Sequence, residues 1–379
     1  MFVPVMALSC VFGLGAPGIA NQGEAGDWSI FRGDSALRGV ATGVIEPPLE
    51  LAWSFKTEQG VRSSAAVVGG RVYVGSNDAR MYALDLETGQ LVWEFKTGAE
   101  IESSPLVMDG RVYFGSGDGK LYALESATGA RVWEYETGDR ILGAPNWFGT
   151  GDKLQVLVGS YDYRLHAVDA LTGKSNWVYE TGNYINGAPA VYKGQTVFGG
   201  CDALLHVLDL ASGEKVKEIE AGAYIAGSVA LAGGRAYLGH YDNEVLCIDL
   251  ERGERVWAYR DRNFPYFSSP AVGEDRVVIG GRDRRVHCLD RATGKVLWVF
   301  AARGKVDSSP VIAGDKVVVG SDDGRLYLLA LADGAALWSY EVGEAVASSP
   351  AVARGWVVVG SDDGRVYAFR SKGKAPSKP

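Results

Sequence analysis

Residues 103–138 read SSPLVMDGRVYFGSGDGKLYALESATGARVWEYETG and contain the pattern that the rest of the chain repeats. Four short apolar runs, at 103–107, 112–115, 121–124 and 132–135, are separated by turn residues such as Asp-Gly and Thr-Gly. The runs are rich in Val, Tyr and Phe, which favour strands, and glycine supplies the left-handed residue of a short hairpin loop. The stretch predicts four antiparallel strands, here called A to D, and no helix.

This unit recurs about every 40 residues along the chain. A Gly-x-x-Asp loop precedes strand C in each of eight copies, and a tryptophan recurs in strand D, with Lys217 at one position. A fixed period of this length is typical of a propeller, a solenoid or an array, and four antiparallel strands per unit favour a β-propeller. The repeated tryptophans, which we expect to wedge between neighbouring blades, are Trp53, Trp93, Trp133, Trp177, Trp257, Trp298 and Trp338.

The two ends of the repeat array indicate how the ring closes. Residues 51–56 resemble a D strand with no A, B or C strand before it, whereas 348–369 resemble A, B and C with no D after them. If the N-terminal strand completes the last blade, no sheet edge is left open. The sequence therefore predicts an all-β, eight-bladed propeller of four-stranded antiparallel blades, closed by the N-terminal strand.

The remaining segments flank this propeller, which we place at 51–370. Residues 1–20 are apolar and then small, typical of a signal peptide that ends near Ala20, and predict export to the periplasm or cell envelope. The sequence around Cys10 faintly resembles a lipoprotein cleavage box, so a lipid anchor stays open. Residues 21–50 form a lead-in segment, and 371–379 are expected to be a disordered tail.

Composition excludes some classes of partner. The chain has 38 basic and 46 acidic residues, a formal net charge of −8, and no basic tract. Nucleic-acid binding is therefore not expected, because it depends on clustered positive charge. Apart from the signal peptide, no segment is long and apolar enough to span a membrane. We expect a monomer.

The histidines and cysteines do not show the spacing of a metal site. His166, His206 and His287 occupy a strand C position that is tyrosine in other copies, and equivalent positions in different blades are related by rotation about the ring axis. Their rings are therefore not expected to converge on one ion. His240 stands alone in a loop, and the cysteines are expected to be buried thiols. The Gly-Ser-x-Asp-Gly loops have too few oxygens for calcium, so each Asp is expected to hold its own turn.

The repeat closely resembles the pyrroloquinoline-quinone (PQQ) type propeller repeat. The resemblance rests on Ser-Ser-Pro, Val-Tyr-Val-Gly-Ser-x-Asp-Gly-x-Leu-Tyr-Ala-Leu-Asp and Thr-Gly-x-x-x-Trp, which together cover 51–369 in eight copies. The lead-in from Asp27 to Asp34 also resembles that superfamily. It includes eight-bladed quinoprotein dehydrogenases and cofactor-free propellers similar to BamB, of the outer-membrane barrel-assembly machinery.

The resemblance implies that a dehydrogenase of this superfamily would hold PQQ over the central channel, on calcium, under a disulfide between adjacent cysteines. This chain has no Cys-Cys pair. The residues before Ser-Ser, or its equivalent, include only two acids, Glu102 and Asp307, and these do not assemble a calcium cage or a general-base pair. We therefore predict no cofactor, no metal and no catalytic residue, and keep a PQQ-dependent dehydrogenase as the alternative.

Blades three to six depart from the consensus in the D-to-A and B-to-C connections, which emerge on one face, called the top. There the small or charged consensus residues become aromatic: Tyr161, Tyr163, Tyr184, Tyr224, Tyr241, Phe264, Tyr266 and Phe267. Polar residues at the same level are Asn183, Asn186, Asn243, Arg260, Arg262, Arg282 and Arg284.

Tyrosine and arginine clustered on one sector of a rim are typical of a binding surface. The sequence thus predicts a non-enzymatic scaffold that docks a protein or peptide on the top face of blades three to six. Packing of the altered loops and binding of a small sugar are the alternatives.

Overall fold

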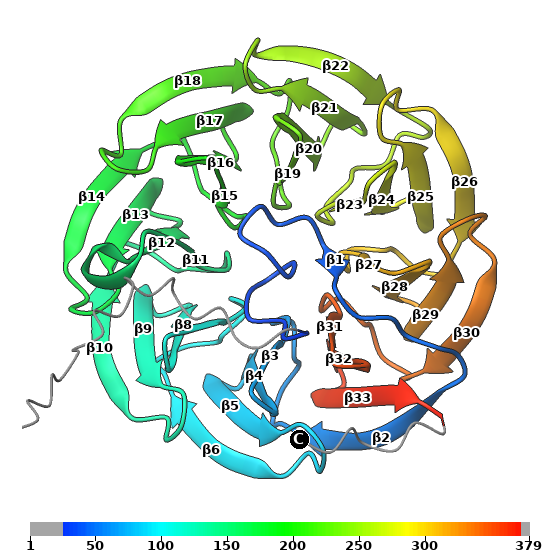
Figure 1. The fold of residues 1–379 in the computed structure, drawn as a ribbon, viewed down its shortest axis with the longest axis horizontal. Coiled ribbons are helices and arrows are strands. Elements are labelled where there is room, and N and C mark those ends of the chain that lie inside the picture. Colours follow the sequence, from blue (N-terminus) through cyan, green and yellow to red (C-terminus); the bar gives the residue numbers. More distant parts are fainter. Residues whose placement is uncertain (1–25, 373–379) are drawn as a thin grey trace, which may run out of the picture.

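The computed structural model describes residues 26–372, which form a ring of eight β-sheets around a central axis (Figure 1). Each sheet has four strands paired in antiparallel order, and one carries a short fifth strand. The predicted all-β, eight-bladed propeller is therefore confirmed. The predicted signal peptide at 1–20 and residues 373–379 of the predicted tail lie outside the described residues.

Each blade begins near the axis with a short A strand, which pairs with a longer B strand. The A strands are β3 (Ala66–Val68), β7 (Leu106–Met108), β11 (Asn146–Phe148), β15 (Ala190–Tyr192), β19 (Ala230–Ala232), β23 (Ala271–Val272), β27 (Val311–Ala313) and β31 (Ala351–Ala353). The B strands are β4 (Arg71–Ser76), β8 (Arg111–Gly115), β12 (Gln155–Gly159), β16 (Gln195–Gly199), β20 (Arg235–Gly239), β24 (Arg276–Gly281), β28 (Lys316–Ser321) and β32 (Trp356–Ser361).

The C and D strands complete each blade toward the outer rim. The C strands are β5 (Arg80–Asp85), β9 (Lys120–Glu125), β13 (Arg164–Asp169), β17 (Leu204–Asp209), β21 (Val245–Asp249), β25 (Arg285–Asp290), β29 (Arg325–Ala330) and β33 (Arg365–Ser371). The D strands are β6 (Leu91–Lys96), β10 (Arg131–Glu136), β14 (Ser175–Glu180), β18 (Lys215–Glu220), β22 (Glu254–Tyr259), β26 (Val296–Ala301), β30 (Ala336–Glu341) and β2 (Leu49–Lys56). Strands B and C are buried on both faces because neighbouring blades cover them, whereas D strands alternate.

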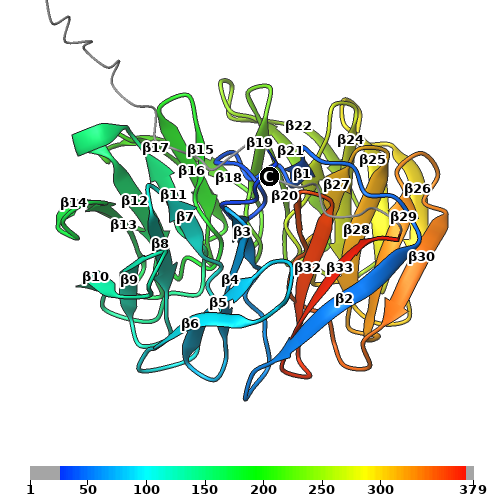
Figure 2. The same cartoon turned by 60° about the horizontal axis from the view of Figure 1, so that its bottom comes forward.

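Two short elements stand outside this scheme. β1 (Val40–Ala41) adds a parallel edge to β27, and the 3-10 turn η1 (Gly151–Lys153) lies between β11 and β12. The D-to-A and B-to-C connections emerge at the face called the top, which lies at the lower side of Figure 2, and the A-to-B and C-to-D connections emerge at the opposite, bottom face. Each loop of the candidate site therefore reaches the same face of the ring.

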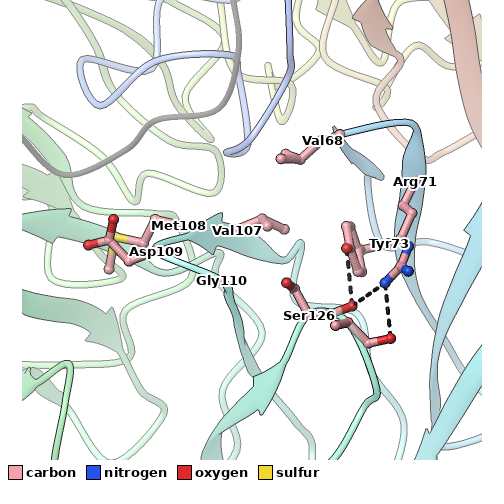
Figure 3. Close-up of a pocket in the computed structure, with 10 residues that line it drawn as sticks. Val68, Arg71, Tyr73, Val107, Met108, Asp109, Gly110 and Ser126 are labelled. Atoms are coloured by element: carbon pink, nitrogen blue, oxygen red, sulfur yellow. Dashed lines mark hydrogen bonds between the residues drawn. The ribbon is translucent and has the colours of Figure 1, made fainter.

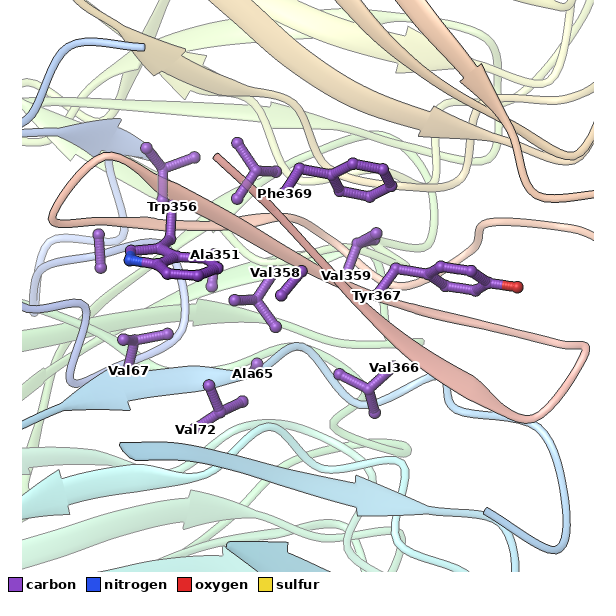
Figure 4. Packing of buried hydrophobic residues seen from close by; sticks show 14 of the residues in the cluster. Ala65, Val67, Val72, Ala351, Trp356, Val358, Val359, Val366, Tyr367 and Phe369 are labelled. Atoms are coloured by element: carbon purple, nitrogen blue, oxygen red, sulfur yellow. The ribbon is translucent and has the colours of Figure 1, made fainter. Parts of the chain in front are cut away.

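The N-terminal strand closes the ring as predicted. β2 pairs antiparallel with β33, with Leu51 opposite Phe369 and Lys56 opposite Arg365, and begins two residues earlier than expected, at Leu49. Apolar side chains from both ends of the chain pack together at this junction, with Val67 and Val72 of blade one facing blade eight (Figure 4). The junction between the two ends of the chain is thus part of a continuous hydrophobic core.

The tryptophans join neighbouring blades, as predicted. The indole N–H of Trp93 donates to the carbonyl of Ser126 in the next blade, at 2.9 Å. The ring lies on Gly129, which has φ +73° and where an added Cβ would come within 2.7 Å of the indole. Glycine is required there both by its conformation and by the close approach. Lys217 replaces the indole once, and its Nζ donates to the equivalent carbonyl, of Leu250, at 2.9 Å.

The lead-in segment closes the bottom of the central channel. Residues 26–41 cross the middle of the ring (Figure 1), and their carbonyl oxygens accept hydrogen bonds from the inner edges of the A strands. Six A strands donate in this way at 2.7–2.9 Å, through the backbone N–H of Val67, Val107, Val191, Leu231, Val272 and Ile312. The segment satisfies edges that would otherwise be unpaired.

Arg32 anchors this segment. Its side chain is 1% exposed, and its Nη1 and Nη2 donate to the carbonyls of Ser309 and Pro310 at 3.1 and 2.6 Å. Burial lowers the pKa of Arg32 to about 9, with Asp34 acting in the opposite direction. The contact fixes the lead-in to blade seven.

Candidate functional site

In five of the eight Gly-x-x-Asp loops, the aspartate holds its own turn and also accepts a hydrogen bond from the backbone of the preceding D-to-A connection, which ties two blades together. Asp118 accepts hydrogen bonds from the backbone N–H of Lys120 in its turn and of Gly98 in the preceding D-to-A connection. The hydroxyl of Tyr122 donates to the same carboxylate at 2.7 Å. The structural role predicted for the aspartates is therefore confirmed in six loops, whereas the carboxylates of Asp242 and Asp283 contact Arg260 and His287 instead.

Histidine replaces that tyrosine in three blades and makes the equivalent contact. His166 Nε2 lies 3.0 Å from Asp162 Oδ2, and its Nδ1 lies 3.0 Å from the hydroxyl of Tyr135 in the preceding blade. His206 and His287 are bonded in the same way. The three rings are therefore interblade contacts, each with its own aspartate and tyrosine.

One of these contacts brings a third acid close. The ligand atoms of Asp261, Asp283 and His287 lie within 4.8 Å of one another. Arg285 already compensates the negative charge of the carboxylates, since its Nη1 lies 2.9 Å from Asp261 Oδ2. We assign no metal to the group.

His240 replaces the loop serine of the Gly-Ser-x-Asp pattern and is buried. Its Nδ1 accepts the backbone N–H of Asp242 at 3.1 Å. Burial lowers the pKa of His240, partly opposed by Glu244 and Asp242. The neutral ring is thus favoured in the folded state, so its contribution to stability is present above the ordinary histidine pKa of about 6.5 and is lost as the pH falls below it.

We expect the His240→Ser variant to lose less stability on acidification than the original protein, because serine does not become charged. Urea unfolding at about pH 7.5 and about pH 5.5 measures the difference in the free energy of unfolding at each pH. An equal decrease in both proteins would contradict the assignment.

The central channel forms a cavity of about 290 Å³ above the lead-in, with Phe31 in its lining. Its wall is mostly serine, glycine and alanine. Serine side chains link successive A strands around it, and the ring is completed where Ser348 Oγ donates to the carbonyl of Ser63 at 3.0 Å. These serines therefore hold the blades together.

Charged pairs lie at the top of the channel. Arg62 lies 3.6 Å from Glu102 and 3.2 Å from Asp362, whereas Arg282 binds Asp307 through two nitrogens, with the shortest contact at 2.8 Å. The two acids singled out in the sequence thus each face an arginine. Asn186, also in the channel wall, donates its Nδ2 to Cys201 Sγ at 3.0 Å.

A first aromatic cluster spans blades three and four on the top face. The ring of Tyr184 stacks on Tyr161, with centroids 4.7 Å apart, and meets Tyr163 edge-on at 5.0 Å. The guanidinium of Arg140 lies 4.6 Å from the Tyr161 ring centroid. Burial raises the pKa of Tyr161, with Arg140 acting in the opposite direction.

A second aromatic cluster spans blades five and six. Tyr224 meets Tyr241 edge-on at 6.2 Å, and Tyr241 contacts Phe267 at 4.5 Å between centroids. The guanidinium of Arg282 covers Phe267 at 3.6 Å from the ring centroid, a close cation–π contact. Within each cluster the rings therefore pack against one another, as expected if the altered loops serve only for packing. Most of the rings nevertheless keep a broad exposed face.

The other predicted residues have different positions. Phe264 and Arg284 are exposed and line a groove of about 600 Å³ beside blade six. Asn243 is half-buried and adopts φ +64° in its turn. Tyr266 is 1% exposed and packs on His287, so its ring is not available to a partner and we remove it from the candidate surface.

The repeat contained a signal for this correction. Tyr266 occupies a position that is valine or isoleucine in the seven other blades, all of them buried. Conversely, the sequence reasoning missed Arg140, Arg303 and Lys305, which the structure brings to the aromatic clusters or to the groove. Comparing aligned positions, rather than residue types alone, would have separated Tyr266 from its neighbour Phe267.

A further pocket, of about 490 Å³, lies on the bottom face between blades one and two (Figure 3). Arg71 donates to the carbonyls of Ser126 and Ala127, and the hydroxyl of Tyr73 donates to Ser126. Arg111 and Tyr113 make the same contacts to the following blade. Because the arrangement repeats, we attribute it to blade packing.

Comparison with known proteins agrees with this architecture. The sequence profile of the family described as outer membrane protein assembly factor BamB matches residues 44–259 and 265–375. The chain belongs to this BamB-like family. No curated protein matches the sequence.

Solved structures share the fold at low sequence identity. BamB from Moraxella catarrhalis is 22% identical, with a TM-score of 0.73 over 87% of this chain and 99% of that one. Quinohemoprotein alcohol dehydrogenase from Comamonas testosteroni is 17% identical, with a TM-score of 0.79 over 94% of this chain and 82% of that one. The computationally designed protein Ika8 is 19% identical, with a TM-score of 0.75 over 85% and 99% of the two chains. These likenesses show the fold alone.

The channel of this BamB-like chain does not suit a quinone held on calcium. Calcium binds six to eight oxygen ligands, mostly from carboxylates and carbonyls. The carboxylates at the top of the channel, Glu102 and Asp307, face Arg62 and Arg282, and a cation placed between them would meet like charge.

Among the described residues, no helix is long and apolar enough to cross a membrane.

Proposed function

We propose that this BamB-like protein is a binding scaffold that docks a peptide or extended protein segment on its top face. The docking surface, called here the aromatic sector, is formed by loops of blades three to six. It consists of Tyr161, Tyr163, Tyr184, Tyr224, Tyr241, Phe264 and Phe267, with Arg140 and Arg282 stacked on two of the rings.

One observation carries the proposal. Within residues 26–372, every large aromatic side chain that stays broadly exposed belongs to the aromatic sector: Tyr163, Tyr184, Tyr224, Tyr241 and Phe264, at 38–50% exposure. The other exposed large apolar residues are all aliphatic. Aromatic rings and arginine dominate the energetics of protein interfaces, because they bury a large area at a small cost in side-chain entropy.

The family suggests where this scaffold works. Its description names an outer-membrane protein assembly factor, and we place this protein in the same setting, exported to the cell envelope and bound to a protein partner there. Fold likeness to dehydrogenases does not carry their chemistry, since unrelated functions share one fold.

A triple substitution tests the docking surface. We expect Tyr184→Ala, Tyr224→Ala and Tyr241→Ala together to weaken binding of the partner by about a hundredfold or more, since loss of each central aromatic residue costs about 2 kcal/mol or more. The melting temperature should stay nearly unchanged, because exposed side chains contribute little to stability. A photo-cross-linking residue at the same positions identifies the partner, and titration with the purified partner measures affinity.

The matched control replaces three aliphatic residues of similar exposure on outer strands, Leu91→Ala, Val216→Ala and Val296→Ala. It should leave binding intact. A large fall in melting temperature with unaltered binding in the tyrosine variant would favour the packing alternative. If the original protein binds a glycan specifically on an array and the tyrosine variant does not, the ligand of the aromatic sector is a sugar and not a peptide.

A further inference from the structure

The groove beside the aromatic sector is strongly cationic. Its lining contains the side chains of Arg262, Arg282, Arg284, Arg303 and Lys305, against two carboxylates, Asp283 and Asp322. They come from loops of blades six and seven and from the connections that precede them, so the groove crosses a blade boundary on the top face. It is open and about 600 Å³ in volume.

Most of these cations form no ion pair within the described part of the chain, although Lys305 acts electrostatically on Asp322 in the same lining. Arg282 is paired with Asp307, but the side chains of Arg262, Arg284 and Lys305 lie in no ion pair among residues 26–372, and neither does that of Arg303. The neighbouring Arg285, in contrast, binds Asp261 at 2.9 Å. Of the two carboxylates in the lining, Asp283 is buried and bonded to His287.

This local charge runs against the composition of the protein. The whole chain carries a formal net charge of −8, so a groove lining with two carboxylates and five cations, of which only Arg282 is paired, with Asp307, is not a consequence of average composition. Like charges that share a groove repel one another, and an anionic ligand relieves that repulsion. Guanidinium groups suit carboxylates in particular, because they bind both oxygens with paired hydrogen bonds.

The groove continues the aromatic sector. Tyr224, Tyr241 and Phe267 follow one another at contact distance, and Arg282 covers Phe267 while it also lines the groove. The exposed ring of Phe264 lies in the groove itself. A segment that packs on these rings therefore reaches the cations without leaving the surface.

We propose that the segment docked on the aromatic sector is acidic, and that its Asp or Glu carboxylates bind in the cationic groove between the top-face loops of blades six and seven. This inference rests on the proposed docking function and specifies the chemistry of the partner. The aromatic sector would supply affinity, and the groove would select acidic sequences and favour rapid association.

The test uses two labelled peptides, one in which glutamate alternates with phenylalanine and one in which glutamine replaces every glutamate. Fluorescence anisotropy should show the glutamate peptide binding at least about tenfold more tightly at about 20 mM NaCl, with the difference falling at about 300 mM as salt screens the charges. The variant Arg262→Glu, Arg284→Glu, Lys305→Glu should abolish that difference.

The control reverses three exposed cations in bottom-face turns, Lys174→Glu, Arg252→Glu and Lys295→Glu, which changes the net charge equally. It should keep the preference for glutamate. Equal behaviour of the two charge-reversal variants, or equal binding of the two peptides, would overturn the inference. If inorganic phosphate displaces the glutamate peptide and binds as tightly as the peptide carboxylates do, the groove is a site for small anions. That result would also overturn the inference.

The tyrosine variant separates this inference from the docking function. If Tyr184→Ala, Tyr224→Ala and Tyr241→Ala abolish binding of the natural partner while the groove variant binds it normally, the docking function stands and the acidic segment is wrong. If neither variant affects the natural partner, both proposals fail. Circular dichroism and melting temperature establish that every variant is folded.

Discussion

Removing β2 is expected to leave the protein without a stable closed ring. A chain that begins at Thr57 lacks the strand that pairs with β33 over seven register positions from Leu49 to Lys56. It also loses the buried ring of Trp53, whose indole N–H donates to Leu86 at 2.7 Å in blade one. β33 would then present an open edge and the junction core would be exposed. We expect the melting temperature to fall by at least about 15 °C, or the chain to fail to fold.

A permuted chain provides the matched control. Leu49 lies opposite Ser371, so a short turn can join the end of β33 to the start of β2 as an ordinary hairpin. The permuted chain starts at Thr57 and carries residues 49–56 after such a turn, so it lacks the lead-in just as the truncated chain does. Scanning calorimetry should show most of the stability restored. Equal melting temperatures in the truncated and permuted chains would contradict closure by β2.

Replacement of one interblade tryptophan is expected to have the second largest effect. Trp133 is 9% exposed, packs against Tyr113 at 5.7 Å and lies on Gly173 of the next blade. Its indole N–H donates to the carbonyl of Ala170 at 3.1 Å. Trp133→Ala removes this contact and leaves a cavity between rigid sheets, so we expect a loss of about 3–5 kcal/mol in the free energy of unfolding, measured by urea denaturation.

Lys217 offers the comparison within the same chain. It stands at the tryptophan position of blade four and binds the next blade through its ammonium group, at 2.9 and 2.8 Å from two carbonyls. No large ring is buried there, so Lys217→Ala should cost about 1 kcal/mol. If Trp133→Ala and Lys217→Ala lower the free energy of unfolding by similar amounts, the repeated tryptophan does not stabilise the protein through burial of its ring.

The candidate site was only partly predictable from residue types. Tyrosine and phenylalanine in top-face loops were correctly expected to lie on one sector, because loops of equivalent strands emerge on the same face. Tyr266 and Phe267 are adjacent, yet one is buried on His287 and the other lies under Arg282. Residue type does not distinguish them, because the direction of each side chain depends on its place in the blade.

The role of the lead-in was also beyond the local pattern. Asp27 to Asp34 resembled part of the superfamily, but nothing in that stretch indicated that its carbonyls would pair with six A strands and close the channel. Arg32 is likewise polar in the sequence and fully buried in the structure. Its partners, the carbonyls of Ser309 and Pro310, lie about 280 residues away in the chain.

The sequence by itself determined the strands, the number of blades and the closing strand, because apolar runs and turn residues act between near neighbours and recur with a fixed period. Only the tertiary structure decided which loop residues share a surface. Rotation about the ring axis brings Arg262, Arg284 and Lys305 into one groove, although they lie in separate loops. The spacing between them depends on how the blades pack, and local sequence does not encode it.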